Sequence, residues 1–385
     1  GFEKVWFIVN HLYEQIESHF GHGEDFGIDI QYYVEPTPLG TVGGVKALQS
    51  ELDQPFLVLY GDVLMDMDLS RLLDFHKVKG ADATLVVHPN DHPYDSDLLD
   101  VDSHDKVTAF YAKPHPEGLQ YRNLVNAAAY VFNPIVLDYL EAGVKADFGK
   151  DIFPSLHKEL DLYAYNTPEY LKDMGTPDRL YKVEEALQSG KVAARNLNQL
   201  QKCVFLDRDG VINIDTDLIH RPKDFQLYPY AAESIKKLNK MGFLVVVVTN
   251  QSVIARGLCT IKELGDIHKK METELGADGA FVEAIYFCPH HPHGGFEGEI
   301  QEYKVKCECR KPSPGMLLQA QKRYNIDMGQ SFLVGDSPRD IEAGANANVT
   351  TIRVKTGHGM KPHTTIPDHY VDTLVEAVRI IEKKQ

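Results

Sequence analysis

The feature that most constrains the fold is a short apolar run, residues 203–206, that is followed at once by an Asp-x-Asp-Gly sequence. The run predicts a buried strand, whose carboxyl end is where ligand sites of open α/β sheets lie. Side chains two apart on an extended backbone share a face, so Asp207 and Asp209 can address one substrate atom, and Gly210 allows a sharp turn. A solvated turn explains this short pattern equally well. The rest of the chain must decide between the two interpretations.

Two other apolar runs of the second half also end in polar residues. Residues 243–248 precede Thr249, whose hydroxyl can donate to a phosphate oxygen, and residues 332–335 precede Asp336. Carboxylate oxygens are ligands that favour magnesium over softer metals. We expect Mg²⁺ to be held by the acids of these strand ends: Asp207, Asp209 and Asp336, with Asp340 in support.

This set of groups predicts phosphate ester hydrolysis. Asp207 would attack phosphorus to give an aspartyl phosphate that water hydrolyses, and Asp209 would protonate the leaving alcohol and later activate the water. A carboxylate that approaches a phosphate dianion is repelled by it, so Mg²⁺ and Lys311 are the expected counter-charges. For Arg256, a merely solvated arginine is the alternative to a substrate contact. The candidate substrate-binding residues are Asn250, Gln251, Arg256 and Arg310.

The order of these groups on successive strand ends resembles the haloacid dehalogenase (HAD) phosphatase superfamily. The residues that carry the resemblance are Asp207, Asp209, Thr249, Lys311, Asp336 and Asp340. It implies a Rossmann-like, doubly wound parallel sheet and a magnesium-dependent phosphomonoesterase.

Cysteine and histidine cluster in the loop 288–309. A Cys-x-His pair and a Cys-x-Cys pair separated by a loop predict a closed, structural zinc site, with free thiols as the alternative. Zinc would fix the loop that carries Arg310 and Lys311 into the active site. Within the HAD superfamily, this loop resembles the branch of heptose 1,7-bisphosphate 7-phosphatases and histidinol-phosphate phosphatases, apart from Val253, where glycine is common. The expected zinc ligands are Cys288, His290, Cys307 and Cys309.

The first half alternates predicted strands and helices, which indicates a second doubly wound, mostly parallel α/β sheet. One buried strand ends at Asp62, and Asp173 lies just before a helix. Each carboxylate could hold a divalent metal or simply cap a turn or helix. The glycine-rich residues 35–44 could present backbone amides to a phosphate or a base, or could be a plain connector.

Residues 1–188 resemble the sugar-1-phosphate nucleotidyltransferase family. The matching segments are residues 35–44, 60–62, 112–114, 126–132, 148–154 and 173–177. The resemblance implies that Asp62 and Asp173 bind Mg²⁺ and that Lys113 and Asn126 contact the sugar phosphate. It also implies that Leu39, Gly40 and Thr41 lie near the nucleotide base.

The family's first strand and its glycine-rich, arginine-containing loop have no counterpart in this sequence. The chain starts at Gly1 rather than at methionine, and we expect that upstream residues are missing. Without that loop, the resemblance implies weak or absent nucleotidyl transfer.

Length and composition set the remaining limits. A chain of 385 residues favours two domains, and we place them at 1–188 and 202–385, joined by the polar linker 189–201. A net charge of -16 argues against nucleic acid and anionic membranes as partners, and no apolar run approaches the roughly 20 residues that span a membrane. Five cysteines, three of them beside histidines, favour a reducing, cytoplasmic location. A homo-oligomer is compatible with the sequence.

The two resemblances together predict consecutive steps of nucleotide-activated heptose (GDP-heptose) synthesis for a surface glycan such as lipopolysaccharide. Removal of the 7-phosphate from heptose 1,7-bisphosphate leaves the 1-phosphate that a guanylyltransferase would accept together with GTP. The alternatives are a histidinol-phosphate phosphatase and a phosphatase whose first half is a non-catalytic scaffold.

Overall fold

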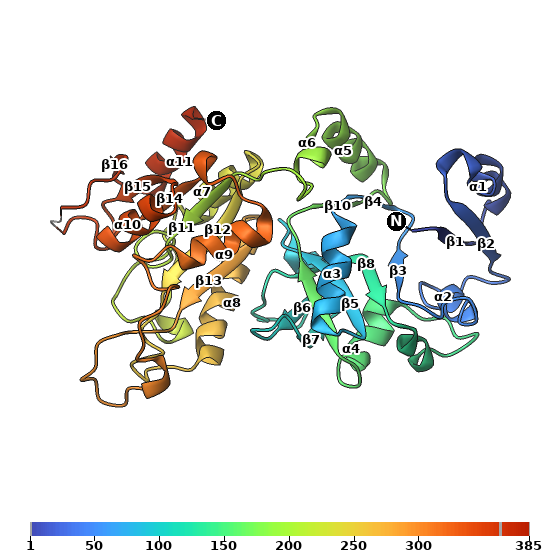
Figure 1. Cartoon of the computed structure of the whole chain (residues 1–385), viewed down its shortest axis with the longest axis horizontal. Coiled ribbons are helices and arrows are strands. Elements are labelled where there is room, and N and C mark those ends of the chain that lie inside the picture. The colour runs from blue at the N-terminus through green and yellow to red at the C-terminus, as the bar shows by residue number, and fades with distance from the viewer. Residues whose placement is uncertain (1, 362–363, 385) are drawn as a thin grey trace.

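Two α/β lobes form from the alternating apolar strands and amphipathic helices in the computed structural model, which describes residues 2–361 and 364–384 (Figure 1). Strands up to residue 173 lie in the first lobe, and strands from residue 203 onward lie in the second. The strands of the second lobe are β11 (Cys203–Leu206), β12 (Leu244–Asn250), β13 (Ala284–Cys288), β14 (Phe332–Gly335), β15 (Thr350–Val354) and β16 (His369–Val371). Its helices are α7 (Ala231–Lys240), α8 (Ile261–Ala277), α9 (Gly315–Tyr324), α10 (Pro338–Asn346) and α11 (Leu374–Lys383).

The second-lobe sheet has the order β13-β12-β11-β14-β15-β16 with every pair parallel, which confirms the predicted doubly wound sheet. Side chains alternate along β11, so Val204 and Leu206 pack towards α7, α8 and α11 while Phe205 packs towards α9 and α10. The sheet is therefore covered on both faces. The strand order reverses beside β11, and such a switch point is where open α/β sheets bind ligands.

The first lobe is also α/β, but its main sheet is mixed rather than mostly parallel. Only the pair β5–β9 is parallel in the order β7-β6-β8-β5-β9 of the described residues, and β3 joins β8 antiparallel. A tight connection between β6 and β7 forces an antiparallel hairpin, which sequence periodicity does not reveal. The strands are β1 (Lys4–Val9), β2 (Asp29–Val34), β3 (Phe56–Leu59), β4 (Val63–Asp66), β5 (Ala83–His88), β6 (Leu98–Val101), β7 (Val107–Tyr111), β8 (Val125–Phe132), β9 (Leu162–Asn166) and β10 (Tyr170–Asp173).

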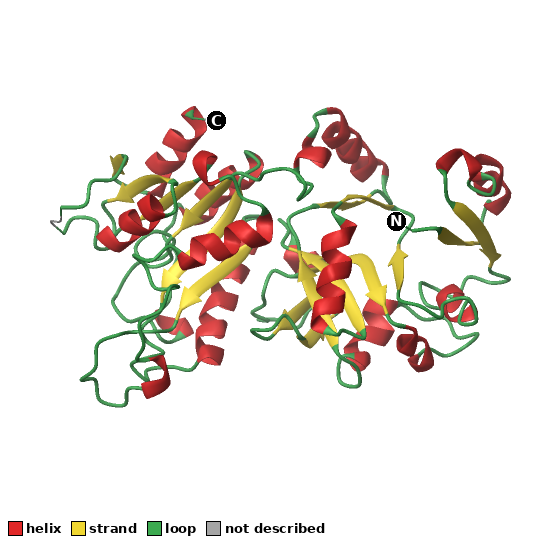
Figure 2. Cartoon of the chain, viewed as in Figure 1, coloured by secondary structure: helices red, strands yellow, loops and turns green. Residues whose placement is uncertain are grey.

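Smaller ribbons complete the first lobe. Strands β1 and β2 form a parallel pair that stands apart from the main sheet in Figure 2, and β4 pairs antiparallel with β10. The helices are α1 (Tyr13–Phe20), α2 (Gly43–Ala47), α3 (Leu69–Lys79), α4 (Phe153–Leu156), α5 (Pro177–Gln188) and α6 (Lys191–Ala194). In the described part of the chain, no helix has the length and apolarity needed to cross a membrane.

The two lobes touch along α8 of the second lobe. Lys269 Nζ lies 2.6 Å from Asp100 Oδ2, and the Arg122 guanidinium pairs with the buried carboxylate of Glu272. The segment predicted as a linker, 189–201, contains α6 and buries Leu197 in the second-lobe core. The connection is thus anchored rather than free.

Candidate active site

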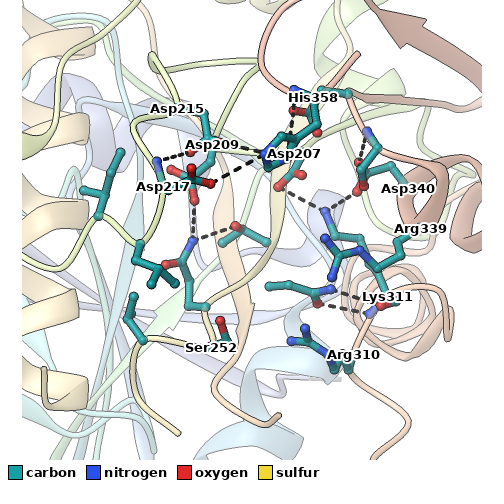
Figure 3. Close-up of a pocket in the computed structure, with 18 of the residues that line it drawn as sticks. Asp207, Asp209, Asp215, Asp217, Ser252, Arg310, Lys311, Arg339, Asp340 and His358 are labelled. Carbon is teal, nitrogen blue, oxygen red and sulfur yellow. Dashed lines mark hydrogen bonds and ion pairs between the residues drawn. The ribbon is translucent and has the colours of Figure 1, made fainter. Parts of the chain in front are cut away.

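The predicted carboxylates meet at the carboxyl ends of the central strands of the second lobe. Asp207 follows β11 and Asp336 follows β14, while Thr249 is the second-last residue of β12. All three line one cavity of about 210 Å³, with Asp209, Lys311 and Asp340 at the same cavity wall (Figure 3). The sequence-predicted groups of the second half are therefore brought together.

Lys311 is the cation at the centre of this cluster. Its Nζ lies 3.0 Å from Asp207 Oδ1 and 2.6 Å from Asp340 Oδ1, and it donates to the Val248 carbonyl at 2.6 Å. The side chain is only 1% exposed. Asn250 fixes its backbone, since the Asn250 amide donates to the Lys311 carbonyl and accepts from the Lys311 N–H, both at 3.0 Å. We infer that Asn250 positions Lys311, a different role from the predicted substrate contact.

Asp340 is held in place from a second side. Its Oδ2 accepts from the Ser337 hydroxyl at 2.7 Å and from the Ser337 N–H at 2.9 Å, which forms a capping box at the start of α10. The Asp340 carboxylate is thereby turned towards Lys311, and the supporting position predicted for it agrees with this geometry.

Asp209 is surrounded by hydrogen-bond donors. The buried Arg208 guanidinium donates to both of its oxygens at 2.9 Å, Asn213 Nδ2 donates at 3.0 Å and Gln251 Nε2 donates at 2.8 Å. His268 Nε2 lies 3.4 Å from Arg208 Nη1 and helps to orient the guanidinium. Gln251, predicted to contact substrate, is thus placed to orient Asp209.

Two glycines allow the loops to close around Asp336. Gly210 has φ +80°, and a Cβ there would lie 2.4 Å from Asp336 Oδ2. At Gly357, with φ +54°, a Cβ would lie 2.2 Å from the same oxygen. Any larger residue would displace the carboxylate, so glycine is needed at both positions.

Burial and crowding shift the protonation equilibria of these acids. Burial, followed by repulsion from Asp340, raises the pKa of Asp207 well above its usual value and raises the pKa of Asp336 to about 6. Burial also acts to raise the pKa of Asp209, but Arg208, Gln251 and Asn213 outweigh it and lower that pKa. The negative charge of the carboxylates around Asp207 and Asp336 is therefore larger than the positive charge that Lys311 supplies.

That excess is what a divalent cation would relieve. Ligand atoms of Asp207, Asp336 and Asp340 all lie within 4.8 Å of one another, and Asp215, Asp336 and His358 form a second such group. Oxygen donors of this kind suit Mg²⁺. Asp209, predicted as a fourth ligand, belongs to neither of these groups among the described residues, because its carboxylate is held by Arg208, Asn213 and Gln251.

The cavity has walls of opposite charge. Arg310 and Arg339 lie on one side of the cavity, and Asp215 and Asp217 lie on the other (Figure 3). Arg256 and His358 complete the charged lining. Only Arg256 and Arg310 were expected from the sequence. Asp215, Asp217 and His358 lie in loops, and Arg339 lies in the first turn of α10. The spatial arrangement identifies all four.

The loop 288–309 shapes the cationic wall. Its Phe296 ring stacks on Arg256, with the guanidinium carbon 3.9 Å from the ring centroid, so Arg256 is fixed rather than merely solvated. Arg310 Nη1 donates to the His290 carbonyl at 2.9 Å. Both arginines are thus oriented by the loop.

The four predicted zinc ligands converge in the same loop. The Sγ atoms of Cys288, Cys307 and Cys309 are 3.2–3.6 Å apart, and His290 Nδ1 lies 3.4 Å from Cys309 Sγ. Zn–S bonds of about 2.3 Å in a tetrahedron place sulfur atoms roughly 3.8 Å apart. The set could therefore hold one tetrahedral ion with little movement.

In the first lobe the predicted residues form two groups. Asp62 and Asp173 both lie beside Gly175, where an added Cβ would be 3.5 Å and 3.1 Å from their carboxylate oxygens, and Arg179 Nη1 is 2.7 Å from Asp173 Oδ2. Lys113 belongs to the second group, and its Nζ donates to the Asp95 carbonyl at 3.1 Å.

The second group lies around Asp97 and Asp147. Asp97 accepts from the Lys113 N–H through its carboxylate and from the Asn126 N–H through its carbonyl. Thr41 Oγ1 donates to Asp147 Oδ2 at 3.1 Å, and the Leu39–Gly40 backbone pairs with Ala146.

Comparison with known proteins gives a family for each half. A family model described as nucleotidyl transferase matches residues 1–190, and one described as HAD-hydrolase-like matches residues 308–377. The D-glycero-beta-D-manno-heptose-1,7-bisphosphate 7-phosphatase of Yersinia pestis is 40% identical over 188 residues, which are 49% of this chain and 96% of that protein. The Escherichia coli K12 protein of the same name is 39% identical over 184 residues, 47% of this chain and 94% of that protein.

Solved structures resemble each half as well. D,D-heptose 1,7-bisphosphate phosphatase from B. bronchiseptica, complexed with magnesium and phosphate, has 35% identity and a TM-score of 0.43, and covers 48% of this chain and all 100% of its own. HddC from Yersinia pseudotuberculosis has 20% identity and a TM-score of 0.42, over 49% of this chain and 80% of its own.

Proposed function

This chain belongs, through its second half, to the heptose-1,7-bisphosphate 7-phosphatase family of HAD-type hydrolases, and we propose that it removes the 7-phosphate of D-glycero-D-manno-heptose 1,7-bisphosphate. The observation that carries the proposal is the buried ion cluster in which Lys311 bridges Asp207 and Asp340. It holds the Asp207 carboxylate in a fixed position in the cavity lining, as a nucleophile requires.

In this proposal, an Asp207 oxygen attacks phosphorus and forms an aspartyl phosphate as the bond to the sugar oxygen breaks. The phosphate dianion of the substrate favours protonation of Asp209 against the pull of Arg208, Gln251 and Asn213, and the protonated Asp209 gives its proton to that oxygen. It then accepts a proton from the water that hydrolyses the intermediate and releases phosphate. Thr249, which accepts from Gln251 at 2.9 Å, has its own hydroxyl proton available for a phosphate oxygen. Lys311 offsets the repulsion between carboxylate and phosphate.

The metal requirements follow from the two donor sets. Mg²⁺ would be held by Asp207 and Asp336, with Asp340 in support, and when bound it would supply positive charge to the phosphate oxygens. Zn²⁺ would be held by Cys288, His290 and the cysteines of the Cys-x-Cys pair, as a structural ion.

The charge pattern of the cavity favours a substrate with a second anionic group. Arg256, which packs on Phe296 of the loop 288–309, and Arg310 both line the cavity, and guanidinium forks bind phosphate well. A sugar bisphosphate offers a second phosphate to these arginines, and histidinol phosphate has none. This supports the heptose substrate over the histidinol alternative.

We propose that the first half, a nucleotidyltransferase-type domain, binds the resulting sugar 1-phosphate, with GTP as the expected co-substrate. Calorimetry with GTP and Mg²⁺ distinguishes this from the scaffold alternative. A heat of binding that saturates supports a binding site, whereas injections without a measurable heat of binding support a scaffold. The proposed setting is the cytoplasmic synthesis of activated heptose for a surface glycan.

A phosphate-release screen tests the phosphatase assignment. The substrates are sugar bisphosphates, sugar monophosphates and histidinol phosphate, each with the wild-type chain and with Asp207→Asn. We expect heptose 1,7-bisphosphate to give the highest kcat/KM and Asp207→Asn to abolish turnover. Faster turnover of histidinol phosphate would rule out the heptose assignment.

A further inference from the structure

A second cavity, of about 220 Å³, lies between the two lobes and shares no lining residue with the active-site cavity. The first lobe contributes the end of β5 and the start of β10, and the second contributes α7 and the segment before β13. Helix α6, from the anchored connection, completes the wall with Lys191 and Arg195. The cavity is therefore a product of the fusion of the two lobes.

Positive side chains converge on this cavity. Lys191 and Arg195 come from α6, and Lys236 and Lys240 come from α7. The chain as a whole is acidic, with a net charge of -16, so four basic side chains around one cavity differ from its average composition. The acidic residues of the same lining are Asp91, Glu169 and Glu283.

Two of these acids are already engaged by other groups. Glu169 accepts from the N–H groups of Asp68 and Leu197 through Oε1, and from the Thr167 hydroxyl through Oε2. Glu283 Oε2 accepts from the Val245 N–H at 2.7 Å, and its Oε1 lies 3.8 Å from Arg195 Nη1. Neither carboxylate is free to neutralise the lysines.

Of the four cations, Lys236 donates to the Asp278 carbonyl at 2.9 Å, whereas the others are weakly paired or unpaired. Within residues 2–361 and 364–384, the ammonium groups of Lys191 and Lys240 make no hydrogen bond or salt bridge. Arg195 has only the long contact with Glu283, although its side chain is just 12% exposed. Burial and then repulsion from Arg195 and Lys172 lower the pKa of Lys191. An anion in the cavity would relieve this repulsion.

We propose that this interlobe cavity binds the phosphate group of a small phosphorylated metabolite. An arginine fork and two unpaired ammonium groups supply several charge-assisted donors, which match the three or four oxygens of a phosphate better than the two of a carboxylate. The volume lies below the roughly 300–1,000 Å³ typical of drug-sized ligand sites, and so suits orthophosphate or a sugar monophosphate. This inference does not depend on the proposed phosphatase reaction.

Isothermal calorimetry of the whole chain tests this proposal, with orthophosphate and mannose 1-phosphate as the probes. The titration is done without magnesium, so that the crowded carboxylates of Asp207, Asp336 and Asp340 repel phosphate from the active site. We expect one saturable site for orthophosphate, with an affinity that falls as ionic strength rises. Tighter binding of mannose 1-phosphate that is lost in Lys191→Ala/Lys240→Ala would show that the cavity also holds the sugar.

Matched variants locate the site. We expect Lys191→Ala/Lys240→Ala to raise the dissociation constant at least about tenfold, a loss of about 1.4 kcal/mol. Lys145→Ala/Lys262→Ala, which removes the same charge from exposed positions elsewhere, should bind like wild type. Unchanged phosphatase activity and melting temperature verify that both double variants fold. No saturable binding up to about 10 mM, or equal binding by both double variants, would overturn the proposal.

Discussion

Lys311→Met gives the most specific test of the ion cluster, because this side chain bridges Asp207 and Asp340. Methionine keeps most of the volume but leaves acidic groups within 4.8 Å of one another with no bridging cation. Removing one partner of a buried ion pair costs about 3–5 kcal/mol. At about 2–4 °C per kcal/mol, the transition of the second lobe should fall by roughly 6–20 °C at pH 8.

The assay is calorimetric unfolding in magnesium-free buffer, since the one tryptophan, Trp6, lies in the first lobe and does not report on the second. Loss of Lys311 raises the pKa of Asp207 further above its value in the unfolded chain, and it removes the attraction that lowers the pKa of Asp340. The folded variant then holds protons that the unfolded chain releases, so its stability should recover as the pH falls from 8 to 5. Lys311→Met/Asp340→Asn removes both charges and should regain a large part of the loss at pH 8. A single variant as stable as wild type at pH 8 would refute the reasoning.

Three further predictions concern other parts of the molecule. Gln251→Ala removes a donor to Asp209, and steady-state kinetics should show kcat reduced about tenfold with little change in KM, whereas an increase confined to KM would favour a substrate contact. Cys309→Ser should abolish zinc binding measured by elemental analysis and raise KM for the bisphosphate, while full retention of zinc would contradict the ligand set. Burial raises the pKa of Glu283 from 4.5 to about 7, against the pull of Arg195, so the folded chain keeps a proton that the unfolded chain loses. The free energy of unfolding should therefore fall as the pH rises from about 4.5 to about 7. Glu283→Gln should flatten the plot of melting temperature against pH over this range, and an unchanged plot would contradict the raised pKa of Glu283.

The second-lobe site could be predicted largely from the sequence because its groups sit at strand ends. An apolar run fixes where a strand stops, and parallel strands bring their carboxyl ends to one edge, so Asp207, Thr249 and Asp336 had to meet. The convergence of the Cys-x-His and Cys-x-Cys residues of the loop 288–309 likewise follows from their spacing.

Other features depend on side-chain direction, which periodicity does not encode. Asn250 and Gln251 follow Thr249 in sequence and line the cavity, but their amides are hydrogen-bonded to Lys311 and Asp209. His358 and Asp215 reach the cavity from loops far apart in the chain, with no local pattern to mark them.

The first lobe shows the same limit at the level of topology. The alternation of strands and helices predicted an α/β fold but not the direction of each pair, because the hairpin from β6 to β7 and the reversal at β8 are set by connections and tertiary packing. The interlobe cavity could not be predicted at all, since α6 and α7 meet only when the lobes dock.

The most direct test of the central claim is chemical trapping of the intermediate on Asp207. Wild-type chain turning over heptose 1,7-bisphosphate with Mg²⁺ is quenched in acid and reduced with borohydride, which converts an aspartyl phosphate to homoserine, and the peptides are analysed by mass spectrometry. We predict homoserine at position 207 alone, with the sugar 1-phosphate as the product. Homoserine at another acid, or undiminished turnover by Asp207→Asn, would contradict the proposed mechanism.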